Sequence, residues 1–170
     1  MTIQKEPLNF NTFGINAFPM EQLKLNNQIC FPFYAISRLI TRAYQPYLDV
    51  LGITYPQYLV LMVLWETDNI SVHEITDKLI LNTNTVTPLL KRMATQGIIT
   101  RNRSDQDERK VIISLTEKGI DMKSKAASIP EALAKSFINE DFSLNQFHEL
   151  KANLNGIITV LKESELDNSI

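Results

Sequence analysis

The chain has 170 residues, of which 44% are hydrophobic and 21% are charged, and its formal net charge is −2. This length fits one domain with helical extensions, and the composition is that of a globular protein. No stretch approaches the roughly 18 consecutive apolar residues of a membrane helix, residues 1–10 lack a secretory signal pattern, and one cysteine cannot form an internal disulfide. We therefore expect a cytoplasmic protein that makes no contact with a membrane.

Positive charge is concentrated in the middle of the chain. Residues 71–115 contain seven Lys/Arg and five Asp/Glu, a balance of +2, whereas residues 1–70 carry −1 and residues 116–170 carry −3. A local basic region can bind nucleic acid even in an acidic chain. The charge pattern therefore permits DNA binding by the middle segment without establishing it.

The first half of the chain predicts an arm and two helices. Residues 1–22 have no sustained period and predict an irregular arm. Apolar residues recur at helical spacing from Phe31 to Leu51, and Pro32 places the helix start near residues 29–31, because proline fits only the first turn. A second helix, apolar nearly all round and therefore buried, begins near Thr54.

The middle third predicts two short helices and a hairpin. The run Ser71-Val72-His73-Glu74 has the form of a capping box and opens a helix over about 72–79. A tight polar corner leads into a helix over about 84–96, which Gly97 closes. The β-rich runs 98–101 and 111–115 flank a charged turn. This order predicts a winged helix-turn-helix over residues 55–116 in a mainly α fold with a small β-hairpin wing.

The outer face of the second short helix has the chemistry of a DNA-reading surface. Thr and Asn side chains can reach base edges, and cations can neutralise phosphates. In the wing tip from Arg103 to Lys110, Arg109 is placed to enter a minor groove, with Asp107 as its brace. Each feature alone fits a solvated surface, but their ordered combination favours DNA. The candidate contacts are Thr83, Asn84, Thr85, Thr87, Lys91, Arg92, Arg103, Asp107 and Arg109.

Two segments carry a family resemblance. Asp107-Glu108-Arg109 followed by Leu115-Thr116 resembles the wing signature of the MarR family of regulators, and residues 89–99 are similar to its recognition helix and first wing strand. The resemblance implies a homodimer on a pseudo-palindromic double-stranded operator, with half-sites about 10 bp apart. Dimerisation would use residues 23–54, which also form the sensor, and residues 117–170, whose apolar stripe over 144–161 exceeds what one small domain can bury.

For this family, the resemblance also implies which side chains read DNA. Thr83, Thr85, Thr87 and Arg92 would contact the major groove, and Arg109 would enter the minor groove.

Cys30 is a candidate redox sensor because of its position. A helix start near residues 29–31 puts its thiol at a positive helix end, where a thiol pKa falls and the thiolate fraction rises. Tyr34 follows one turn later, where its hydroxyl could donate to the sulfur. The alternative is that Cys30 is simply a small apolar residue.

The surrounding sequence resembles a particular branch of the family. Residues 25–31 and 53–58 look like the organic-hydroperoxide-sensing OhrR branch. The resemblance makes Cys30 the peroxidatic residue, gives Tyr34 a role in supporting the neighbouring helix, and has Tyr44 and Tyr55 hydrogen-bond the sulfur of the partner subunit. Pro32 departs from the pattern. No resolving cysteine is present, so a low-molecular-weight thiol or overoxidation would complete the reaction.

Three other functions fit the same sequence. The chain could be a MarR-type regulator of a lipophilic or aromatic ligand with Cys30 incidental, a thiol peroxidase, or a regulator that acts through protein partners. No metal-ligand spacing or cofactor motif is present, and His73 and His148 are far apart in the sequence. We therefore expect a regulator that is not an enzyme and carries no metal or cofactor.

Overall fold

A computed structural model describes residues 23–138 and 143–167. The chain divides into two compact units, Met1–Pro46 and Tyr47–Ile170, and each is described by itself. The predicted arm over residues 1–22 lies outside the described residues. In the described part, no single helix is both long and apolar enough to cross a membrane.

The first unit consists of a 3-10 turn, η3 (Leu25–Asn27), and most of helix α1 (Cys30–Leu51). Helix α1 starts where Pro32 predicted it. As the third residue of the helix, Pro32 removes no hydrogen bond, because the first four N–H groups of a helix have no partner within it. Pro46 lies inside α1, where its ring removes a donor. The division between the units follows directly after it.

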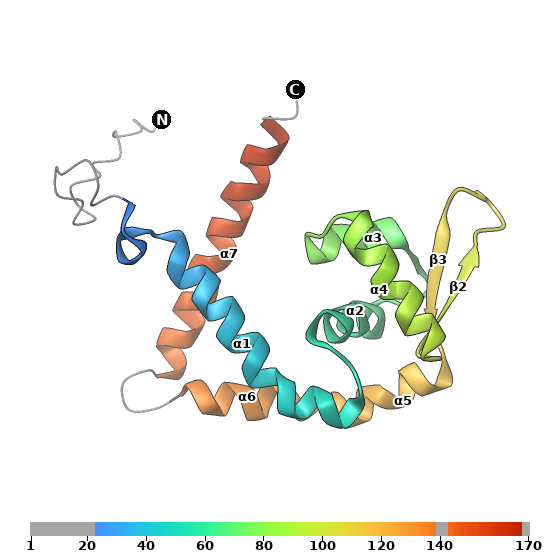
Figure 1. The fold of residues 1–170 in the computed structure, drawn as a ribbon, viewed down its shortest axis with the longest axis horizontal. Coiled ribbons are helices and arrows are strands. Elements are labelled where there is room, and N and C mark those ends of the chain that lie inside the picture. Colours follow the sequence, from blue (N-terminus) through green and yellow to red (C-terminus); the bar gives the residue numbers. More distant parts are fainter. Residues whose placement is uncertain (1–22, 139–142, 168–170) are drawn as a thin grey trace. The chain divides into compact units, whose positions relative to one another are not determined.

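The second unit has the order of a winged helix (Figure 1). Helix α2 (Tyr55–Glu66) and strand β1 (Ile70–Ser71) precede helices α3 (Val72–Leu79) and α4 (Thr83–Thr95). Strands β2 (Ile99–Arg103) and β3 (Val111–Leu115) form the predicted hairpin wing. Helices α5 (Glu117–Ala126), α6 (Ile129–Phe137) and α7 (Leu144–Asp167) complete it. The mainly helical fold with a small wing is confirmed.

The sheet has three antiparallel strands in the order β1-β3-β2. Ile70 in β1 and Arg101 in β2 both pair with Ile113, the central residue of β3. Strand β1 was not predicted, because two residues carry no periodicity of their own. It exists because β3 offers its second edge to the chain as it enters α3.

The core of this unit is built around α2 and the inner face of α4. Helix α2 is buried along most of its length, and Tyr58, Leu61 and Leu64 are at most 2% exposed. The Trp65 indole N–H donates to the Gly119 carbonyl at 2.9 Å, and its ring meets Tyr58 edge-on. These aromatic residues pack the core. The inner face of α4 is also buried: Val86, Leu89, Leu90 and Met93.

Local hydrogen bonds define the helix-turn-helix. The Glu74 N–H donates to Ser71 Oγ at 3.2 Å, and the Ser71 N–H donates to the Glu74 carboxylate at 2.8 Å, which confirms the capping box of α3. Helix α3 ends at Ile80, whose φ of 54° lies in the left-handed region. That conformation is costly for a β-branched residue. The Leu81 N–H donates to the Thr76 carbonyl at 3.0 Å and so closes the turn that leads to α4.

Candidate DNA-binding surface and sensor residues

The outer face of α4 presents the predicted polar side chains to solvent. Thr83, Asn84, Thr85, Lys91 and Arg92 are exposed, and Thr87 is half-buried. Pro88 is the sixth residue of α4 and lies in its second turn. The Asn84 carbonyl therefore lacks the N–H that residue 88 would normally supply.

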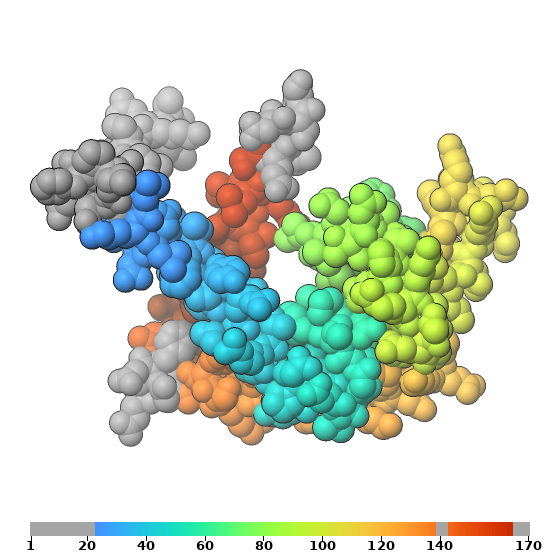
Figure 2. Space-filling view, viewed as in Figure 1, coloured from blue at the N-terminus to red at the C-terminus, as the bar shows by residue number. Residues whose placement is uncertain are grey.

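A groove of about 730 Å³ lies between the start of α3, the start of α4 and the wing. It brings together three predicted contacts, Thr83, Thr87 and Arg109, with Arg101 and Lys110 of the wing. Figure 2 shows α4 and the hairpin tip at the surface of this unit. Asn84, Thr85, Lys91, Arg92 and Arg103 are exposed but do not line the groove.

The wing tip holds Arg109 through Asp107. The Arg109 Nε and backbone N–H each donate to Asp107 Oδ1 at 3.1 Å. These two hydrogen bonds hold the pKa of the Asp107 carboxyl below its usual value. The Arg109 side chain is 90% exposed. The predicted brace is therefore present, and it leaves the guanidinium open to a ligand.

Arg101 is a candidate that sequence reasoning missed. It is half-buried and lines the groove, and within the described residues its Nε is buried without a hydrogen-bond partner. Strand alternation was the available signal, since Arg101 lies on the same side of β2 as the buried Ile99. A cation placed there faces whatever occupies the groove.

The proposed sensor residues lie on α1 and at the start of α2. Cys30 is the first residue of α1, and its thiol is free and exposed. Tyr34 is 63% exposed, and its ring stacks with Phe31 at a centroid distance of 6.4 Å. Tyr44 is half-buried. These three residues belong to the first unit.

Tyr55 opens α2 in the second unit. Burial raises the pKa of its phenol, so the hydroxyl stays protonated at neutral pH and can donate a hydrogen bond. Because Tyr55 and Cys30 belong to different units, a joint sensor site remains a prediction.

The described residues contain no group of three or more His, Cys, Asp or Glu side chains that could hold a metal ion. His73 is exposed on α3, and its Nδ1 lies 3.3 Å from the Asp77 carboxylate.

The helix-turn-helix and its braced wing define the class of a winged-helix protein. A model of the SarA/Rot transcriptional regulators matches residues 42–126, half of the chain. The chain belongs to this family of winged-helix transcriptional regulators.

Two relatives are particularly informative. The organic hydroperoxide resistance transcriptional regulator of Bacillus subtilis is 54% identical over 110 residues, which cover 65% of this chain and 75% of the relative. The structure of reduced AbfR bound to DNA has 36% identity and a TM-score of 0.69, covering 86% of this chain and 98% of that chain. AbfR comes from Staphylococcus epidermidis.

Two further structures extend the comparison. Overoxidized AbfR bound to DNA has 38% identity and a TM-score of 0.62, over 82% of this chain and 99% of that one. Escherichia coli MarR shares the fold alone, with 20% identity and a TM-score of 0.63 over 76% and 96% of the two chains. These likenesses confirm the resemblance found in the sequence.

Proposed function

We propose that the protein is a homodimeric, DNA-binding repressor that senses organic hydroperoxides by oxidation of Cys30 and then releases its operator. The observation that carries this proposal is an exposed thiol at the first residue of α1 in a chain 54% identical to a regulator of organic hydroperoxide resistance. Cys30 is also the only cysteine of the sequence. Any thiol chemistry of the protein must therefore start there.

The groove beside α4 supports the DNA-binding part of the proposal. We place α4 in a major groove, where Thr83 and Thr87 reach base edges, and Arg109 in the adjacent minor groove. Lys91 and Arg92, exposed on α4, neutralise phosphates. Arg101 adds a further cation to the same groove. A relative of the same fold is bound to DNA.

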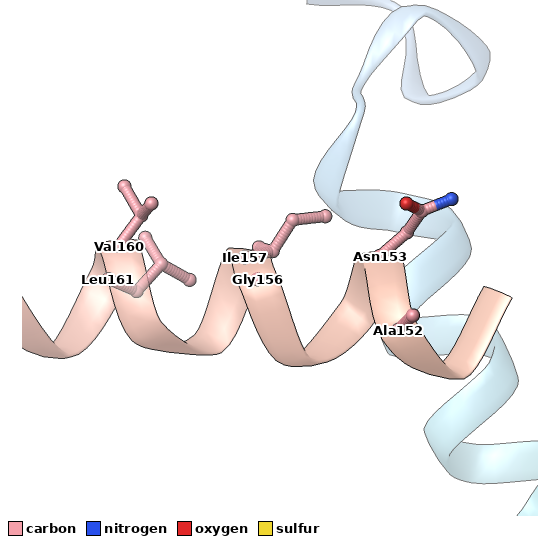
Figure 3. A pocket seen from close by; sticks show the side chains of 6 residues that line it. All are labelled: Ala152, Asn153, Gly156, Ile157, Val160 and Leu161. Atoms are coloured by element: carbon pink, nitrogen blue, oxygen red, sulfur yellow. The ribbon is translucent and has the colours of Figure 1, made fainter. Parts of the chain in front are cut away.

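A dimer follows from the apolar surface of α7. Ile157, Val160 and Leu161 are 43%, 63% and 58% exposed in the single chain. Figure 3 shows them along a shallow face of α7 next to the small residues Ala152 and Gly156. A continuous row of exposed apolar side chains is typical of a surface that another protein chain buries. A second copy covers them and presents two α4 helices to the two half-sites of a palindrome.

In the proposed redox step, Cys30 is the only protein residue that changes its oxidation state. The thiolate sulfur attacks the terminal oxygen of the hydroperoxide, the O–O bond breaks, and the alkoxide leaves and takes up a proton to become the alcohol. Sulfur is oxidised to sulfenic acid as the peroxide is reduced. A low-molecular-weight thiol then attacks the sulfenic sulfur, forming a mixed disulfide and releasing water. Overoxidized AbfR is bound to DNA, so we assign release to the bulkier mixed disulfide.

The test measures DNA binding by fluorescence anisotropy, on a duplex selected from random sequence by the reduced protein. Wild-type protein treated with cumene hydroperoxide and free cysteine is expected to lose affinity at least tenfold, and a reductant should restore it. Cys30→Ser should bind like the reduced wild type and ignore the treatment. Release of the Cys30→Ser variant by hydroperoxide would disprove sensing through Cys30. Repeated turnover of hydroperoxide without selective DNA binding would instead identify a thiol peroxidase.

One observation favours a second candidate, a regulator that responds to a lipophilic or aromatic ligand. An apolar pocket of about 230 Å³ lies between α2, α5 and α6, lined by Tyr58, Met62 and Trp65 among others. Hydrophobic and aromatic linings of this kind accept small organic molecules. This candidate predicts ligand-dependent release of DNA that survives in Cys30→Ser and is lost when the pocket is filled by Met62→Trp.

A further inference from the structure

Two glutamine side chains join the first turn of α2 to the last turn of α4. Gln57 Nε2 donates to Gln96 Oε1 at 2.8 Å, across 39 residues of sequence. Gln57 is only 3% exposed and is one of two polar residues among the buried residues described. A buried amide without partners is costly, so Gln57 depends on the groups around it.

The orientation of the Gln57 amide is determined by its neighbour. The Thr54 N–H donates to Gln57 Oε1 at 2.8 Å, and the Thr54 hydroxyl does so at 3.3 Å. Because a backbone N–H can only donate, the amide oxygen must face Thr54. The NH₂ group must therefore face Gln96. The start of α2 thus allows this side chain one arrangement.

The backbone of Gln96 is held at the end of α4. It is the C-cap residue, its N–H donates to the Arg92 carbonyl at 2.9 Å, and its own carbonyl accepts from Lys118 Nζ at 2.8 Å. Gly97 follows with a φ of 68°, in the left-handed region that ends the helix. The hydrogen bond from Gln57 therefore reaches a residue whose backbone is tied to the turn of α4 that contains Arg92.

The two ends of this link carry the proposed sensor and the proposed DNA contact. Tyr55 lies two residues before Gln57 in the same turn of α2, and Arg92 lies one turn before Gln96 in α4. We infer that the Gln57–Gln96 amide pair is a positioning element that couples the hydrogen bonding of Tyr55 to the placement of α4. This inference rests on the proposed function, because it assigns a route to the response that Cys30 oxidation starts.

Coupling is a free energy between two sites. Its test therefore compares the operator affinity of the reduced protein with that of the oxidised protein, since either affinity alone does not report it. Gln96→Ala removes the acceptor from an exposed position, and Gln96→Glu keeps an oxygen that can accept from Gln57. Thr95→Ala is the matched control, since among the described residues the Thr95 hydroxyl bonds the Lys91 carbonyl of its own helix and no residue of α2. For each variant and the wild type, the operator Kd is measured with reduced protein and with protein treated with cumene hydroperoxide and free cysteine. Intact mass confirms equal modification of Cys30.

The ratio of oxidised to reduced Kd is the readout. Gln96→Ala is expected to lower this ratio about fivefold, the effect of one uncharged hydrogen bond, while Gln96→Glu and Thr95→Ala keep the wild-type ratio. If Gln96→Ala weakens both states equally, the pair is merely structural and the inference is wrong while the proposed function stands. If wild-type protein shows no difference between the two states, the proposed function itself fails.

Discussion

At the scale of single residues, an ion pair with two hydrogen bonds holds Arg109 at the tip of the wing. Asp107 accepts two hydrogen bonds from Arg109 and is held ionised by them. A carboxyl whose pKa is lowered stabilises the fold above its unfolded pKa and loses that contribution as pH falls through the lower, folded value. The brace therefore persists throughout the neutral range, and DNA binding at neutral pH does not depend on the titration of Asp107.

Arg109→Met tests the role of that cation. Loss of one charge that displaces counterions from DNA should weaken binding and reduce the slope of log K against log salt by about 1. Lys125→Met is the control, because it removes the same charge from an exposed site on α5 that does not line the groove. Titrations at several salt concentrations measure both slopes. Equal slopes for the two variants would contradict the placement of Arg109 against DNA.

At the scale of elements, the helix caps do most to define the helix-turn-helix. The capping box of α3 lies at the rim of the groove, because both Ser71 and Glu74 line it. Hydrogen bonds from the Ser71 N–H and hydroxyl lower the pKa of the Glu74 carboxyl from its ordinary 4.5. Its ionised form therefore stabilises the folded state above that pH, and the contribution is lost as pH falls through the lowered value.

Glu74→Gln isolates this electrostatic part of the cap, since glutamine can still complete a capping box. The variant is expected to be less stable than the wild type by about 0.3–1 kcal/mol at pH 7, the usual effect of a charge at a helix N-terminus. The difference should shrink as pH falls through the lowered pKa of Glu74, because the carboxyl then becomes neutral. Urea unfolding at pH 7 and at a series of lower pH values measures it. A difference that stays constant across the acid range would contradict the assignment.

At the scale of the whole molecule, two apolar faces of the single chain support the proposed dimer. The α7 face leaves Ile157, Val160 and Leu161 exposed, and α1 leaves Phe33, Ile36 and Leu39 between 42% and 57% exposed. Exposed apolar side chains at this density are typical of interfaces. The proposed palindromic operator takes two copies of α4, so the proposed function makes the affinity for DNA depend on the same surface.

Ile157→Glu tests this dependence. A buried charge in a dimer interface is strongly unfavourable, so the variant should sediment as a monomer and bind the operator at least tenfold more weakly. Asn155→Glu introduces the same side chain at an exposed position two residues away on α7 and should leave the dimer intact. Analytical ultracentrifugation and anisotropy report the two properties. A dimeric Ile157→Glu variant would show that this face is not the interface.

Much of the fold could be predicted because its signals are local. The Ser71–Glu74 box, the glycine after α4, the apolar spacing of α2 and α4 and the β-rich runs of the wing each act within a few residues. Pro32 likewise placed Cys30 at the start of α1, because proline costs least in the first turn of a helix, where its missing N–H has no partner to lose. The brace of Arg109 by Asp107 was predictable for the same reason, since the two residues are two positions apart.

The tertiary structure decided the features whose partners are distant in sequence. Strand β1 exists only because Ile70 pairs with Ile113, Arg101 became a candidate because β2 turns it into the groove, and Gln57 meets Gln96 across 39 residues. Such contacts have no local signal, because their free energy comes from burial and pairing after the elements have packed. The sequence by itself determined a winged helix with a cysteine at a helix start. Packing decided which side chains share the groove and which side chain joins α2 to the end of α4.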